Sequence, residues 1–228
     1  VNGDTPGHLE RGVQFRCAAA PSSAPTNYRI TPEGAFDPDY TITYQTAFLT
    51  VTPAAQRPFA DAIVSNPSAT PVPGRIEAEA FDQGGEGRAY HDVDAANNGG
   101  QLRLAEGVDI EVTTDTGGGH NITSTAAGEW QEYGIDVAES GEYNLTLRVA
   151  QAGAASIVRV WVGGQPLTTP IALPDTGGVQ NWTSVTKWNI PLSAGSHAMR
   201  VEWIEGGANL KWIEWQPVSN DSPRPLVS

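Results

Sequence analysis

From Gly74 onward the chain alternates apolar and polar residues in short runs, and clusters of Gly, Asn and Asp separate the runs. Such alternation places successive side chains on opposite faces of a strand. The even spacing, without any helical period, predicts an all-β protein: an antiparallel β-sandwich of the jelly-roll type with an irregular, partly stranded N-terminal extension. The predicted strands are 75–80, 108–113, 129–137, 142–150, 156–162, 182–190, 197–204 and 209–216.

The same alternation predicts which side chains form the core. Among the tryptophans, alternation places Trp203 inside, and Trp212 and Trp215 are also expected in the core. Trp161 and Trp188 are candidates for an exposed sugar platform or an interface anchor. The other residues expected to face inward are Tyr143, Leu145, Leu147, Val149, Val158, Val160, Val162, Met199 and Val201.

Residues 1–73 differ in composition, with much of the proline and no tryptophan. Runs 13–18 and 40–52 are the strand candidates there, and 53–73 is typical of a linker or a loosely draped arm. Two strands rarely stand alone in water, so this region is expected to pack on the second domain, on a neighbouring chain, or on a lost upstream domain. The predicted plan is an extension over 1–73, a sandwich over 74–217 and a tail over 218–228.

The formal net charge of -13 and the pI near 4.6 exclude a basic surface for nucleic acid. The one cysteine, Cys17, rules out an internal disulfide. No apolar run has the length of a membrane helix, so no membrane insertion is expected.

The stretch from Asp115 to Tyr133 is predicted to fold back over the end of the sheet and then enter it. Gly117, Gly118 and Gly119 permit backbone conformations that are closed to other residues. Loops held on a rigid sheet collect binding residues. Catalysis is not expected, because Glu129 and Glu132 would face opposite sides of a strand and no serine lies in a Gly-x-Ser-x-Gly motif.

Several motifs occur in a specific order, and together they resemble a family 6 carbohydrate-binding module over residues 74 to about 217. The resemblance implies a non-catalytic β-sandwich with a structural calcium, appended to a secreted polysaccharide-degrading enzyme. It therefore implies an extracellular protein, whose signal peptide is not in this sequence, and a polysaccharide or oligosaccharide partner. The motifs are Gly74–Phe81, Gly84–Asp92, Asn97–Gly100, Glu106–Glu111, the stretch just described, Ala194–His197 and Gly207–Trp215.

The family holds sugar in a cleft at the end of the sandwich, between two aromatic rings and beside a C-terminal Asn. The resemblance assigns the Asn to Asn209 and the polar loop positions to Glu111 and Thr114. Both ring positions depart from the pattern, since Ser124 and Val179 stand there. His120 is expected either to substitute partly for a ring or to face solvent.

Some members use a second cleft on the concave face of the sheet, and its aromatic residue corresponds to Trp130. The alternative is that Trp130 packs with Tyr133 beneath the loop.

For the calcium implied by the resemblance, Glu77 and Glu79 alternate on one predicted strand face and present hard oxygen ligands. The carbonyl of Gly119 and the carboxylate of Glu214 are further candidates. A second oxygen-rich loop carries Asp92 and Asp94, but an Asx-rich turn explains it better than a metal site.

Three functions follow. The first is a secreted, calcium-stabilised glycan-binding module. The second is a structural or self-assembling protein that lost its sugar clamp and packs its N-terminal segment on a neighbouring subunit. The third is an enzyme fragment, with 1–73 as the tail of an absent catalytic domain. The retained motifs favour the first.

Overall fold

The computed structural model describes residues 5–20, 26–52, 55–59, 68–153 and 155–218. The chain divides into two compact units, Val1–Ala54 and Ala55–Ser228. Each unit is described by itself.

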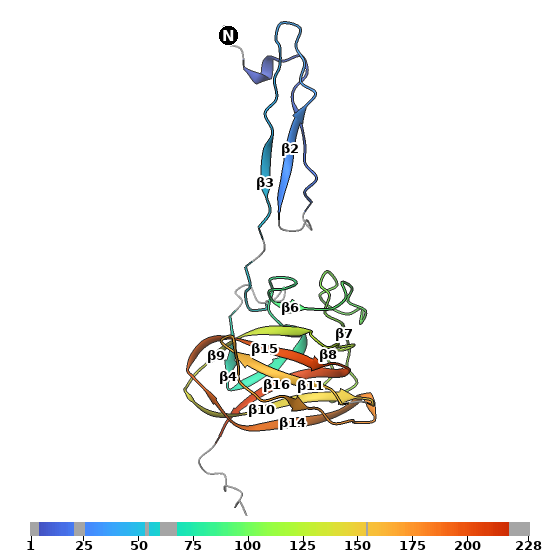
Figure 1. Ribbon diagram of the computed structural model, residues 1–228, viewed down its shortest axis with the longest axis vertical. Helices are drawn as coiled ribbons and strands as arrows, with labels where there is room; N and C mark the ends of the chain where they lie inside the picture. Colours follow the sequence, from blue (N-terminus) through green and yellow to red (C-terminus); the bar gives the residue numbers. More distant parts are fainter. Residues whose placement is uncertain (1–4, 21–25, 53–54, 60–67, 154, 219–228) are drawn as a thin grey trace, which may run out of the picture. The chain divides into compact units, whose positions relative to one another are not determined.

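The second unit is a β-sandwich of two sheets (Figure 1). Every pairing that the structure describes between its named strands is antiparallel, except that β4 runs parallel to β9. The all-β prediction is confirmed. One sheet has the order β14 (Gly178–Leu192), β10 (Gly141–Gln151), β16 (Ala208–Pro217), β8 (His120–Ile122), β7 (Ile110–Val112), with β5 (Gly74–Glu77) on β16. The other has the order β12 (Gln165–Pro166), β11 (Ile157–Val162), β15 (Gly195–Glu205), β9 (Trp130–Val137), β4 (Thr70–Val72), with β13 (Ile171–Ala172) on β11 and β6 (Tyr90–His91) on β9.

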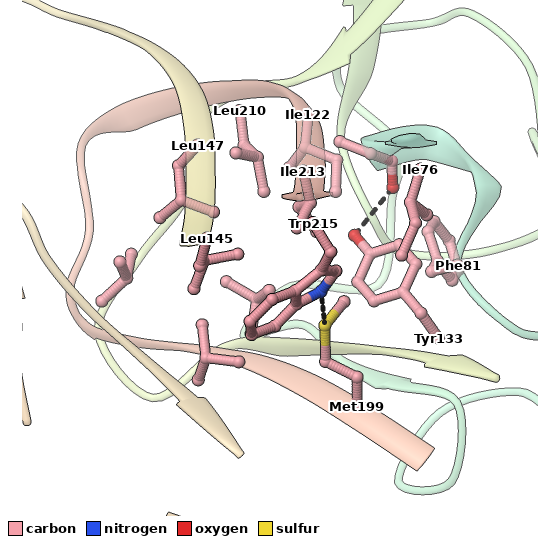
Figure 2. Close-up of a cluster of buried hydrophobic side chains, with 14 of the residues drawn as sticks. Ile76, Phe81, Ile122, Tyr133, Leu145, Leu147, Met199, Leu210, Ile213 and Trp215 are labelled. Atoms are coloured by element: carbon pink, nitrogen blue, oxygen red, sulfur yellow. Dashed lines mark hydrogen bonds between the residues drawn. The ribbon is translucent and has the colours of Figure 1, made fainter. Parts of the chain in front are cut away.

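The core lies between the two inner faces and is centred on Trp215. Leucines and isoleucines surround the indole ring, and its N–H points at the sulfur of Met199, 3.3 Å away (Figure 2). Trp203 is equally buried and donates to Gln131 at 3.1 Å. The inward-facing residues predicted by alternation are buried, apart from Val162, which is partly buried against the core.

Trp212 was expected in the core, and this prediction is wrong. The residue is half-buried, and the guanidinium of Arg75 lies 4.1 Å from its ring centroid. Trp212 alternates with Ile213 and Trp215 along β16, so it faces away from the core in which those two side chains are buried. A register shift between β10 and β16 lies just before it, and so Leu210, two residues earlier, is buried although Trp212 is not.

Each predicted strand overlaps an observed one, but the short strands β4, β6, β8, β12 and β13 were not predicted. Residues 75–80 were expected to continue as one strand. Instead β5 ends at Glu77, and the short 3-10 helix η2 (Ala78–Ala80) follows. Glu79 therefore does not alternate with Glu77 on a strand.

The three consecutive glycines adopt the conformation that the sequence suggested. Gly117, Gly118 and Gly119 have φ angles of 92°, 63° and 90°, in the left-handed region that residues with a Cβ disfavour. This turn joins β7 to β8 and brings Asp115 and Thr116 beside Lys211 of β16.

The sandwich unit begins earlier than the expected boundary at 73/74. Strand β4 pairs with β9, and the Gln56 amide donates to Asp82 at 2.9 Å and to Glu132 at 2.7 Å. Arg57 and Gln83 form a β-bridge. The described residues among 55–73 are thus tied to the sandwich by backbone pairing, while 53–54 and 60–67 of the predicted linker lie outside the described residues.

The first unit holds a three-stranded sheet, β1 (Gln14–Arg16), β2 (Asn27–Glu33) and β3 (Ala47–Thr50), preceded by the short 3-10 helix η1 (Pro6–His8). Only two strands were predicted, because Pro32 and Glu33 obscured the alternation of the central strand β2. The predicted strand 40–52 is reduced to β3. Cross-strand register places Phe15 opposite Pro32, and Tyr28 opposite Leu49, on one face of the sheet.

Candidate functional site

A polar network occupies the end of the sheet that carries β7 and β8. One carboxylate oxygen of Glu111, Oε1, accepts hydrogen bonds from three side-chain amides. The donors are Asn121 at 3.1 Å, Gln180 at 2.6 Å and Asn209 at 2.7 Å. They come from β8, β14 and β16, so four strands are connected through a single oxygen atom.

Gln180 links this network to the neighbouring loop. Its Oε1 accepts hydrogen bonds from the Thr114 amide at 2.8 Å, the Thr114 hydroxyl at 3.0 Å and the Trp182 indole at 3.1 Å. The structure therefore brings together three residues that the sequence assigned to one cleft, Glu111, Thr114 and Asn209. Asn121 and Gln180 were missed, although both are polar residues inside otherwise regular strands.

Of the two positions without aromatic rings, Val179 lies beside this network. The Val179 carbonyl accepts from Asn209 at 2.8 Å, and the Val179 side chain is 47% exposed. Ser124 has a φ angle of 52°, a conformation in which a bulky side chain is strained. His120 precedes Asn121 on β8, so its side chain lies on the opposite face and does not join the cleft.

A second group of aromatic and charged side chains lies on the outer face of the other sheet. The guanidinium of Arg200 stacks on Trp130, 3.7 Å from the ring centroid, and forms an ion pair with Glu132 at 2.6 Å. On the next strand, the Trp161 indole donates to Glu202 at 2.8 Å. Tyr133 instead points into the core and donates to the Ala78 carbonyl at 2.9 Å, so it does not pack with Trp130 (Figure 2).

These side chains form rows across three paired strands. Trp130 lies opposite Glu202, which lies opposite Arg159, and Glu132 lies opposite Arg200, which lies opposite Trp161. We call this set the outer face. Each row presents one indole, one guanidinium and one carboxylate.

Comparison with known proteins decides the family. The family model described as carbohydrate binding module (family 6) matches residues 101–217, about half of the chain. The chain belongs to this family. Modules of the family are non-catalytic and bind carbohydrate.

The module resembles a solved relative along almost the whole of that relative. It is 31% identical to the module CBM6cm-2 of Cellvibrio mixtus lichenase 5A, whose structure is a complex with cellotriose. The match covers 65% of this chain and 99% of that one, with a TM-score of 0.51. A β-1,3-glucan binding module from Bacillus halodurans, 22% identical, covers 65% of this chain and 99% of its own with a TM-score of 0.50, and this likeness shows the fold alone.

Other comparisons cover less. The clotting factor G alpha subunit of Tachypleus tridentatus is 28% identical over 117 residues, which are 50% of this chain and 17% of that protein. The module thus corresponds to a small part of this curated relative. Residues 1–50 match the family model described as MBG domain (YGX type). Within the described residues, no helix is long and apolar enough to cross a membrane.

Of the four expected calcium ligands, Glu77 and Glu79 interact with each other, while Gly119 and Glu214 have hydrogen-bond or ion-pair partners of their own. Burial of the Glu79 carboxyl raises its pKa to about 7, and the charge of Glu77 adds to this shift. The Glu79 Oε2 atom is buried without a hydrogen-bond partner among the described residues. The Gly119 carbonyl accepts the Thr113 amide at 3.1 Å. Glu214 is paired with Arg75 at 3.0 Å.

These residues do not fit a divalent ion as they stand. An unpartnered carboxylate oxygen suits a cation, but the side chain of Lys211 already brings a positive charge among the same acidic residues. No group of three or more His, Cys, Asp or Glu side chains suited to a metal occurs among the described residues. The calcium site stays a prediction, and no part of the proposed function depends on it.

The second oxygen-rich loop is held by its own hydrogen bonds. The Asp94 amide donates to the Asp92 carboxylate at 3.0 Å, and the Ala96 amide donates to Asp94 at 3.1 Å. The Asn98 side chain donates to Asp94 at 3.1 Å. This is the pattern of consecutive Asx turns that the sequence favoured.

Proposed function

We propose that the module binds a β-linked glucan chain on its outer face. The observation that carries the proposal is Trp130, an indole held by Arg200 beside the carboxylate of Glu132. A pyranose presents an apolar C–H face that stacks on an aromatic ring, and its hydroxyls need fixed polar partners. The outer face offers indole rings and charged polar groups on the three adjacent strands β9, β15 and β11.

The end cleft offers only half of this chemistry. Its polar groups are well placed, but they satisfy one another, and Val179 stands where a ring would stack. A sugar entering it would have to replace hydrogen bonds that already exist, without the gain from stacking. We therefore assign the main sugar contact to Trp130 and give Glu111, Thr114 and Asn209 a role in holding the strand ends.

The glucan class is supported by the relative from Cellvibrio mixtus, whose structure is a complex with cellotriose. At 31% identity over almost the whole of that module, we propose that the two proteins bind the same class of sugar. Cellotriose is thus the natural probe.

Isothermal titration with cellotriose, cellohexaose and a β-1,3-glucan oligosaccharide tests the proposal. Trp130→Ala is expected to lower affinity roughly 5- to 30-fold, since stacking on one aromatic ring contributes about 1–2 kcal/mol. Asn209→Ala is expected to leave affinity nearly unchanged in protein that remains folded. The matched control is Trp188→Ala, which removes an indole that is 68% exposed on another strand. Binding that depends on Asn209 and not on Trp130 would overturn the assignment.

We also propose that the protein acts outside the cell as an accessory, non-catalytic part of a carbohydrate-active protein. The β-linked glucans of cell walls lie outside the cell, and the acidic composition favours solubility. Immunodetection of the native protein in the medium checks this location. Detection in the cell pellet only would contradict it.

A second candidate function, self-association, rests on the first unit. One face of its sheet carries Phe15, Tyr28, Ile30, Pro32 and Leu49, and Phe15 is 68% exposed. Single sheets with an apolar face normally pack against a second layer, and a second copy of this unit offers the same face. Size exclusion with light scattering is expected to show a dimer that Phe15→Ser dissociates. Phe48→Ser, on the opposite face and equally exposed, is the control. A monomer at all concentrations would dismiss this candidate.

A further inference from the structure

Lys211 is placed by an irregularity in the sheet. Along β10, the consecutive residues Arg148 and Val149 pair with Trp212 and Leu210 of β16, so Lys211 is the extra residue of a β-bulge. A bulge redirects the side chain of the extra residue. Here the side chain is only 6% exposed, which is rare for a lysine without a specific partner.

The buried ammonium is surrounded by oxygen atoms. The Lys211 Nζ donates to the Thr116 carbonyl at 2.8 Å and lies 3.4 Å from the Asp115 carboxylate. On the other side, β5 places Glu77 opposite Trp212, the residue that follows Lys211. Glu79 lies in η2, directly after β5. The positive charge of Lys211 lowers the pKa of both Glu77 and Glu79, against the larger effect of their burial, so the ammonium acts on both carboxyls.

The same atoms would be the ligands of a hard metal ion. Carboxylates and backbone carbonyls are the oxygens that bind calcium, and Glu77 and Glu79 are the residues at which the sequence predicted it. A divalent ion placed among them would sit next to a buried ammonium that already bonds the carbonyl. Two cations in one poorly solvated cluster repel strongly.

We propose that the ammonium of Lys211 is the resident cation of the cluster formed by Glu77, Glu79, Asp115 and the Thr116 carbonyl, and that it takes the place of a structural calcium ion. The module thus carries its own positive charge at this position. Its fold is stable without metal, and a single substitution can turn the cluster into a metal site.

Thermal unfolding of the full chain, in excess chelator and in excess calcium chloride, tests the proposal. The wild type is expected to melt at the same temperature in both solutions and to show no heat of calcium binding by titration calorimetry. A melting temperature that falls in chelator, or calcium binding at this cluster, would overturn the proposal. Glu79→Gln distinguishes binding at this cluster from binding elsewhere, because it alters only the former.

Lys211→Asp gives the opposite expectation. It replaces the ammonium by a third carboxylate, so its melting temperature is expected to rise in calcium relative to chelator. A folded Lys211→Asp variant with the same melting temperature in calcium and in chelator would show that the ammonium does not occupy a metal position. Should this variant fail to fold, Lys211→Met is informative: a lower melting temperature than wild type, equal in both solutions, supports the proposal. An unchanged one would overturn it.

Discussion

Asp115 and Arg148 form a two-bonded ion pair that ties the glycine-rich turn to β10. The Arg148 Nε and Nη2 atoms donate to the Asp115 carboxylate at 2.8 and 2.6 Å. Asp115 also lies beside Lys211 and is largely buried. Paired guanidinium and carboxylate groups of this geometry are among the stronger hydrogen bonds in proteins.

Asp115→Asn is therefore expected to lower the free energy of unfolding at pH 7 by about 1–3 kcal/mol, since it removes a charge-assisted pair. The Arg148 hydrogen bonds lower the pKa of Asp115 from 3.8 to about 2. A carboxyl with a lowered folded pKa stabilises the fold above its unfolded pKa and loses that contribution as the pH falls through about 2. Denaturant unfolding of both proteins between pH 7 and pH 2 measures this. A difference between them that persists at pH 2 would contradict the ionic origin, and Glu142→Gln on exposed β10 surface is the control.

Trp215→Ala is expected to cost about 3–5 kcal/mol of unfolding free energy, because it leaves a large cavity at the centre of the core. The indole is fully buried, and its N–H contacts the Met199 sulfur (Figure 2). Trp188→Ala removes the same ring from the surface of β14 and is expected to change stability by less than about 0.5 kcal/mol. Chemical denaturation compares the two. Equal losses would mean that Trp215 is not the centre of the core.

The sequence predicted the long strands well because each carries a period-two pattern that only one face can bury. Leu145 and Leu147 needed no information beyond their own run. The short strands carry two or three residues each, too few for a period to show. The prediction for Trp212 was wrong for a related reason. The extra residue Lys211 at the bulge breaks the alternation, so Leu210 faces the core but Trp212, two residues later, does not.

The candidate site residues were predicted from family motifs, and two residues that were not predicted, Gln180 and Lys211, have no local sequence pattern that marks them. Glu111, Thr114 and Asn209 were assigned to one cleft and do lie in one network. Gln180, which links Glu111 to Thr114, has no local pattern that distinguishes it from a surface glutamine. Lys211 was overlooked because burial of a lysine depends on residues far away in the chain, Asp115 and Thr116 among them.

Gly206→Ala is expected to destabilise the sandwich by about 1–3 kcal/mol through overpacking. A Cβ atom at this position would lie 2.2 Å from the Thr125 carbonyl oxygen and 2.5 Å from the Ala126 Cα atom. Both are backbone atoms, so the loop before β9 would have to move. The control is Gly141→Ala, whose Cβ would meet nothing closer than a Tyr143 ring atom at 3.9 Å. Thermal melts of both variants decide the matter, and a Gly206→Ala melt as high as that of Gly141→Ala would refute the close approach.

Val179→Trp is expected to give the end cleft the ring it lacks. Val179 is exposed beside Asn209 and Glu111, so a tryptophan there can stack on a sugar whose hydroxyls reach the polar network. Ser124 is the poorer choice, because its left-handed backbone would strain a bulky residue. The substitution is best made together with Trp130→Ala, which removes the proposed outer-face site.

In that background, calorimetric titration is expected to show cellotriose binding at least tenfold tighter than for Trp130→Ala alone, a gain of about 1.4 kcal/mol. Adding Asn209→Ala should abolish the gain, whereas Val179→Leu, a similar apolar side chain without a ring, should not produce it. A triple variant that still binds would place the new contact outside the cleft. No gain at all would mean that the hydrogen bonds among Glu111, Gln180 and Asn209 cannot be exchanged for bonds to a sugar.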